Sequence, residues 1–141
     1  MAYHRDYIMR MMEMMAEMIA IFLGLIKKGD LQQARKQLNR AYLDLLKQDA
    51  SFFQNLDIDC LTDELISKHN YTNNHLKVLS ELFFAEGKLQ EKLNNSPEAI
   101  TNYKKALLLL NFIEQEASTF SMTANNRKTL IKSRIQELTI P

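Results

Sequence analysis

The sequence predicts an all-α protein, and its composition gives three reasons. Valine occurs once, although strands favour β-branched residues. Glycine occurs three times and proline twice, which is few for the turns that a sheet needs. Leu, Ala, Lys, Gln, Glu and Met are good helix formers and supply a large share of the chain. With 141 residues, we expect a single domain over residues 1–141 that buries a substantial core.

The first predicted helix spans about residues 3–28 and carries an unusually wide apolar surface. One stripe recurs at spacings of three and four residues. Further apolar positions widen this stripe, so neighbours must cover the helix on more than one side. Six of the eight methionines fall between Met9 and Met18. The stripe consists of Ile8, Met11, Met15, Met18, Phe22 and Leu25, and the positions that widen it are Met12, Met14, Ile19, Leu23 and Ile26.

Asp30 is the expected N-cap of the second helix, with Gln33 as the returning half of a capping box. This helix should end near Gln48. The stretch 50–60 resembles a linker, although its phenylalanines suggest that it packs against the domain. A short helix capped by Thr62 should follow and end near residue 69.

Three longer segments complete the predicted chain. A helix over about 72–93 has a clear apolar side. Ser96 should cap the next helix, with Pro97 at its first position, where no amide hydrogen is needed. That helix should reach about residue 117. The last helix should begin after Thr123 and end near residue 138.

Two of these helices share a small–large–small pattern on one face. Small residues let a neighbouring helix approach closely, while the large residue fills the space between the backbones. The pattern therefore predicts tightly crossed helical hairpins. The two sets are Ala34, Leu38 and Ala41, and Ala99, Tyr103 and Ala106.

This pattern resembles the tetratricopeptide repeat (TPR), a helix–turn–helix of about 34 residues. Repeat-like units cover about 15–48 and 80–113, and the helical segment 52–69 between them lacks the signature. Glu86 and Gln90 depart from the repeat, since they replace apolar positions. The layout also resembles small bacterial proteins classed as TPR-like. The resemblance implies five to six helices in antiparallel TPR-like hairpins, with a Met-rich first helix and a C-terminal capping helix. The matching positions are Leu25, Gly29, Asp30, Ala34, Leu38 and Ala41, then Phe83, Gly87, Ala99, Tyr103 and Ala106.

No residue pattern predicts catalysis, a metal site or a cofactor. The histidines are dispersed, without ligand spacing. The acidic stretch 57–64 lacks the glycine and terminal glutamate of a calcium loop. Cys60 has no base nearby in the sequence. We therefore expect a protein that is not an enzyme and binds no metal or cofactor. The three histidines are His4, His69 and His75.

Charge and cysteine content predict a cytoplasmic protein. The net charge of +1 creates no global attraction to nucleic acid or anionic lipid. We expect the basic residues of the last helix, such as Arg127 and Arg134, to form a solvated face. A single cysteine fits a reducing compartment. The apolar run 18–26 lacks a small-residue cleavage site and is shorter than the roughly 20 residues that span a bilayer.

The TPR resemblance implies a non-enzymatic interaction or scaffold module that holds a protein or peptide partner in a groove. It places Ile19, Leu23, Ala85 and Lys88 in that groove. The first three replace the polar residues with which some TPR proteins clamp a C-terminal carboxylate, so apolar contacts should dominate.

The Met-rich helix leaves three alternatives open. Methionine suits adaptable surfaces, so the helix could assemble a structural homodimer through Met11, Met15, Met18 and Phe22. The same side chains could instead fill an irregular core. The helix could also lie in a membrane interface, although its polar side has little cationic excess.

Overall fold

The computed structural model describes the backbone of residues 2–117 and 121–140 and the side chains of 5–117 and 121–140. These residues form helices and no strand, which confirms the all-α prediction. Seven α-helical segments replace the predicted five to six within this part of the chain, because the segment after α2 divides into short pieces. The segments are α1 (Ala2–Lys28), α2 (Leu31–Leu46), α3 (Ala50–Gln54), η1 (Ile58–Cys60), α4 (Leu61–Asp63), η2 (Glu64–Lys68), α5 (Asn73–Lys92), α6 (Ser96–Ala117) and α7 (Met122–Thr139).

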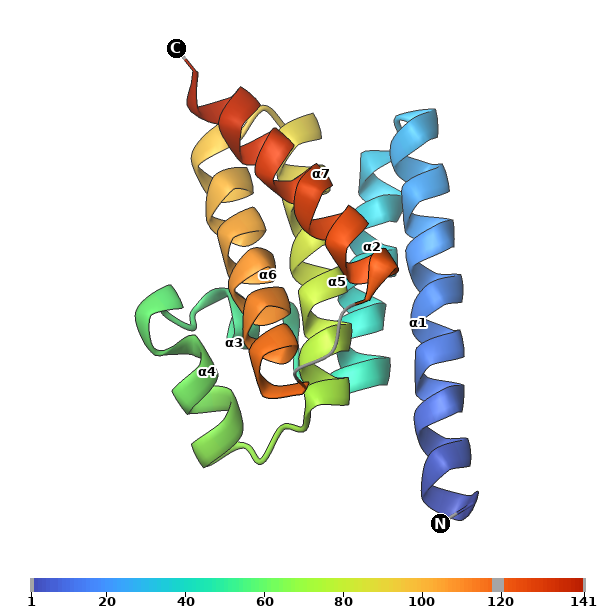
Figure 1. Cartoon of the computed structure of the whole chain (residues 1–141). Helices are drawn as coiled ribbons and strands as arrows, with labels where there is room; N and C mark the ends of the chain where they lie inside the picture. Colours follow the sequence, from blue (N-terminus) through green and yellow to red (C-terminus); the bar gives the residue numbers. More distant parts are fainter. Residues whose placement is uncertain (1, 118–120, 141) are drawn as a thin grey trace.

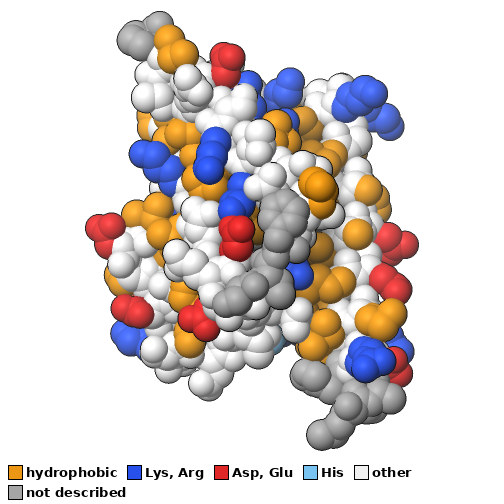
Figure 2. All heavy atoms as spheres, viewed as in Figure 1, with side chains coloured by type: hydrophobic (Ala, Val, Ile, Leu, Met, Phe, Trp, Pro, Cys, Tyr) orange, Lys and Arg blue, Asp and Glu red, His pale blue; other side chains and the backbone are white. Residues whose placement is uncertain are grey.

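Two antiparallel hairpins, α1–α2 and α5–α6, form the body of the molecule (Figure 1). Helix α5 contacts both helices of the first hairpin as well as α6. Helix α7 runs obliquely over the second hairpin and packs mainly on α6. The short segments α3 and α4 lie on the opposite side of the molecule from α1. Figure 2 shows hydrophobic side chains along α1, with charged side chains at its outer edge.

The turn between α1 and α2 follows from its sequence. Gly29 adopts a φ of 81°, which a residue without Cβ accepts easily. The Asp30 carboxylate then accepts a hydrogen bond from the Gln33 amide at 3.2 Å, which is the Asp30 half of the predicted capping box. Helix α2 ends at Leu46, earlier than predicted, because Lys47 takes the left-handed conformation.

One predicted cap and one predicted helix start are wrong. Thr62 lies inside α4, and Asp57 instead caps the preceding 3₁₀ turn by accepting from the Asp59 amide at 3.0 Å. Helix α7 begins at Met122 rather than after Thr123, because the Ser121 hydroxyl accepts from the Ala124 amide at 3.2 Å. In both places several polar residues compete for the cap, and backbone geometry selects among them.

The small–large–small residues of α2 and α6 lie in the core. All six side chains are buried. Helices α5 and α6 approach closely at Gly87, where an added Cβ would lie 2.5 Å from the Tyr103 ring. Helix α5 therefore needs a residue without a side chain at this position.

The polar departures Glu86 and Gln90 form part of a buried network between α2 and α5. Glu86 is buried and accepts two hydrogen bonds from the Arg35 guanidinium, one of them at 3.1 Å. The Tyr42 hydroxyl and the Gln90 amide also donate to Glu86, at 3.2 Å and 3.1 Å. A buried carboxylate needs such hydrogen-bond partners. Glu86 and Gln90, the two residues that depart from the repeat, therefore act together to join the two hairpins.

Candidate functional site

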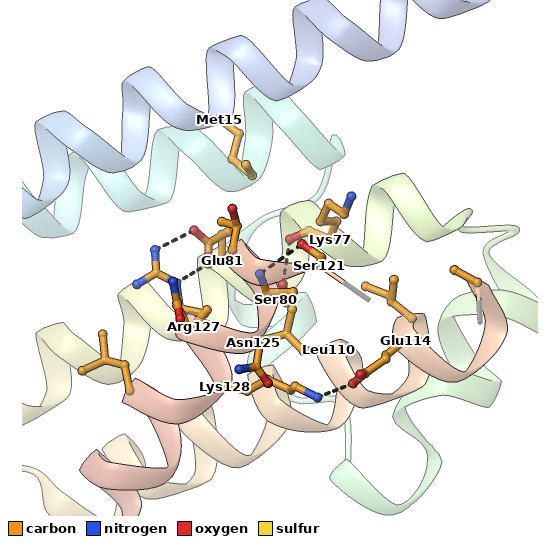
Figure 3. Close-up of a pocket in the computed structure, with 16 residues that line it drawn as sticks. Met15, Lys77, Ser80, Glu81, Leu110, Glu114, Ser121, Asn125, Arg127 and Lys128 are labelled. Atoms are coloured by element: carbon orange, nitrogen blue, oxygen red, sulfur yellow. Dashed lines mark hydrogen bonds and ion pairs between the residues drawn. The ribbon is translucent and has the colours of Figure 1, made fainter. Parts of the chain in front are cut away.

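A cavity lies between α5, the C-terminal half of α6 and the start of α7, with Met15 reaching it from α1 (Figure 3). Its volume is about 530 Å³. This volume falls in the range of sites that bind small molecules or a few side chains.

Helix α7 forms one wall of the cavity. Ile131 is fully buried and anchors the helix. The Arg127 guanidinium stacks on the Phe84 ring, with 3.9 Å between its central carbon and the ring centroid. The same guanidinium donates two hydrogen bonds of 2.9 Å to the Glu81 carboxylate (Figure 3). Arg127 is therefore held rigidly between α5 and α7.

The other charges at the rim are mostly paired. The Lys128 ammonium donates to the carboxylate of Glu114 and, at 3.3 Å, to the side-chain oxygen of Asn111. Lys77 is exposed, and its ammonium forms no ion pair within the described residues. An acidic group at the rim would therefore find a cation in Lys77 without displacing a carboxylate.

The cavity lining is otherwise largely apolar. The apolar side chains come from α1, α6 and α7, and α5 contributes polar ones, so the cavity needs all four helices in place. The apolar lining residues are Met15, Leu110, Ile113, Ala117, Ala124 and Leu130.

Two polar side chains of the cavity, Ser80 and Glu81, already have hydrogen-bond partners within the protein. The Ser80 hydroxyl lines the cavity, but it donates its hydrogen bond to the Lys77 backbone carbonyl at 2.7 Å and not to a side-chain base. Glu81 is held by Arg127. Among residues 5–117 and 121–140, no three His, Cys, Asp or Glu side chains lie together as a metal site requires.

A smaller depression of about 320 Å³ lies further along α5 and α7. It is lined by Lys88, Lys92, Glu91 and Arg134. Burial raises the pKa of Glu91, but hydrogen bonds from Arg134 and Tyr103 outweigh burial and bring it below its ordinary value. The Lys88 ammonium lies 5.8 Å from the centroid of the Phe84 ring, the same ring on which Arg127 stacks. The two depressions thus follow one line beside α7.

The structure separates the four residues expected in a groove. Leu23 and Lys88 are half-buried and reachable from solvent. Ile19 and Ala85 are buried in the core, so a partner resting on this surface would not touch them. The expectation is corrected for these two positions, because neighbouring helices cover the sides of α1 and α5 on which they lie.

The four residues expected in self-association lie mainly inside the subunit. Met11 and Phe22 are buried in the core, and Met15 lines the cavity. Met18 is half-buried, and its carbonyl accepts from the Gln37 amide of α2 at 3.5 Å. A second copy would therefore have to use other side chains of α1.

The remaining chemically versatile residues have structural neighbours. The His69 ring packs edge-on against Phe52, with centroids 5.0 Å apart. His75 Nδ1 accepts from the Thr72 amide at 3.1 Å and completes a capping box at the start of α5. Cys60 is exposed and unpaired. The side chain of His4 lies outside the described residues.

Ion pairs also occupy the basic residues of α7. Arg127, Lys128 and Arg134 pair with Glu81, Glu114 and Glu91. Lys132 is exposed. No described helix is both long and apolar enough to cross a membrane.

The cavity could not be predicted from the sequence, because the cavity depends on where α7 begins and on where α7 crosses the second hairpin. One signal was present, namely the apolar positions Ala124, Ile131, Ile135 and Leu138, which mark a side of the last helix that must pack. No family model, curated protein or solved structure matches this chain.

Proposed function

We propose that this protein is a non-enzymatic interaction module, TPR-like in design, that binds a short peptide or a helix of a partner protein. The partner would lie in the cavity beside α7 and extend along α5 toward Leu23 and Lys88. The observation that carries this proposal is the cavity of about 530 Å³, with its apolar lining and its mostly paired charges.

The packing of α5 supports the TPR-like interpretation. This helix contacts both members of the α1–α2 hairpin and also pairs with α6. Stacked hairpins of this kind expose one helix of each pair on a common surface, and repeat proteins use such surfaces to bind peptides. In the proposed design α1 and α5 would be those helices, and residues of both line the cavity.

The chemistry of the cavity indicates the kind of segment that fits. Its lining would take one or two large apolar side chains. The ammonium of Lys77 would attract an acidic residue beside them, because it has no carboxylate partner among the described residues. We therefore expect a partner segment that combines an apolar anchor with a neighbouring Asp or Glu.

Affinity capture from a lysate of the source organism, followed by direct titration of the purified partner, tests this proposal. Leu130 lines the cavity and is partly exposed, so Leu130→Glu should fold and abolish binding. Leu43→Glu is the matched control, because Leu43 is an exposed leucine on α2 that does not line the cavity. Equal affinity of the two variants for the captured partner would overturn the proposed site.

A charge variant tests the chemistry of the segment. Lys77→Glu should weaken binding by about tenfold, because it replaces an attraction with a repulsion at the rim. An unchanged affinity would show that no acidic group of the partner lies near Lys77.

A further inference from the structure

Helix α1 carries a second row of apolar side chains, which the rest of the subunit leaves uncovered. Tyr7, Met14 and Ile21 are exposed at 55%, 38% and 54%. They recur every seven residues, which is close to two helical turns, so they lie in one line. Met18 and Leu25 are half-buried and border this line. From residue 14 the order 14, 18, 21, 25 has the three–four spacing of a coiled-coil seam, and Tyr7 lies one heptad before Met14.

This outer row is distinct from the core and from the proposed partner site. A helix turns by about 100° per residue, so Ile21 lies about 160° around α1 from Leu23. Met14 is likewise about 100° from Met15, which lines the cavity. A molecule on the outer row would therefore leave the cavity open.

Two unpaired charges flank the outer row on the same side. Arg10 and Glu17 are also seven residues apart. Neither forms an ion pair within the described part of the chain. On this flank Arg10 therefore places a cation before Met14, and Glu17 places an anion after it.

We propose that the outer row binds a second copy of this chain, with the two α1 helices antiparallel and a two-fold axis beside Met14. Tyr7 and Ile21 are equally far from Met14, so each Tyr7 would pack on Ile21 of the second copy. Arg10 lies four residues before Met14, and Glu17 lies three residues after it. Arg10 would therefore lie within about 1.5 Å, along the helix axis, of the level of Glu17 in the second copy.

Charge complementarity selects this arrangement. A two-fold axis perpendicular to antiparallel helices keeps the same flank of both copies on the same side, so two Arg10–Glu17 pairs form. In a parallel pair the axis runs along the helices and places these flanks on opposite sides, which leaves all four charges unpaired. The row from residue 7 to residue 25 spans about 27 Å, a length over which the two helices can pack side by side.

Sedimentation velocity of the full chain over a series of concentrations tests this proposal. The parent should approach twice the chain mass as the concentration rises. Met14→Lys should give a monomer, because it places two ammonium groups at the two-fold axis. Met9→Lys is the matched control, because Met9 is exposed on α1 away from the row, and it should still dimerise. Circular dichroism would verify that both variants are folded.

A charge exchange tests the register itself. Arg10→Glu alone and Glu17→Arg alone should each weaken dimerisation by about tenfold, since each places like charges together. Mixing these two variants should restore the dimer, because each Glu then meets an Arg of the other copy. A parent that stays monomeric up to millimolar concentration would overturn the proposal. Dimers that persist in Met14→Lys, or single variants that mixing does not rescue, would also overturn it.

Discussion

At the residue scale, the close packing of Tyr103 on Gly87 makes this glycine sensitive to a single added methyl group. An added Cβ would lie 2.5 Å from the Tyr103 ring, which is buried and cannot move aside cheaply. Gly87→Ala should therefore lower the free energy of unfolding by about 1–3 kcal/mol, measured by urea denaturation.

Gly24→Ala is the matched control for this prediction. Gly24 also lies within a helix, but an added Cβ there would meet nothing within 4 Å. The gain in helix propensity should stabilise the protein by about 0.5–1 kcal/mol. If both variants shifted stability in the same direction, the tight α5–α6 crossing would not be the cause.

His75 should make the start of α5 sensitive to acid. Burial lowers its pKa below the ordinary value of 6.5, and its Nδ1 accepts the Thr72 amide only when unprotonated. Between the folded and unfolded pKa values the unfolded chain binds more protons, so stability is full above pH 6.5 and declines below it. His75→Gln keeps a residue suited to the capping box but does not titrate. Urea denaturation at several pH values should show a smaller decline for this variant.

At the element scale, Ile131 is the most deeply buried side chain by which α7 packs on the rest of the molecule. Ile131 is the single residue of α7 that is buried within the described chain. Ile131→Ala should cost about 2–5 kcal/mol at this contact. Hydrogen exchange should then show faster exchange over 122–139, while α5 keeps its protection. Equal loss of protection in both helices would mean that α7 does not open separately.

The helices also show which element boundaries can be predicted from the sequence. The bounds of α1 and α5 follow from apolar periodicity together with the turn residue Gly29 and the N-cap residue Thr72. The helix boundaries within segment 50–68 were harder to predict. Its helical turns are shorter than one period of the apolar pattern, and Asp57 and Thr62 compete as caps. Local signals fix long helices well, whereas short ones depend on packing that comes from elsewhere in the chain.

The candidate site was less predictable than the elements, for a physical reason. Periodicity identifies an apolar position but does not say which neighbour covers it. Ile19 and Leu23 lie on the same broad apolar surface of α1, yet one is buried and the other is partly exposed. The cavity depends further on Arg127 bridging Glu81 and Phe84, contacts between residues far apart in the sequence.

At the scale of the whole molecule, the proposed partner site and the proposed dimer surface occupy different sides of α1. Binding at one should therefore leave the other unaffected. Leu130→Glu should reduce partner affinity without changing the sedimentation behaviour, and Met14→Lys should do the reverse. Measuring partner affinity and sedimentation on both variants therefore tests whether the two sites act independently. A variant that lost both properties would indicate that the sites are coupled or that the fold is damaged.

The order in which the helices pack also has a consequence for folding speed. The most extensive helix contacts, between α1 and α2, between α5 and α6 and between α6 and α7, join neighbours in the chain, whereas the packing of α5 on the first hairpin joins segments further apart. Chains dominated by such local contacts fold on the order of microseconds to milliseconds, because little loop entropy is lost before contacts form. We therefore expect each hairpin to assemble within its own stretch of chain, and the docking of α5 onto α1 and α2 to be the slowest step in stopped-flow refolding.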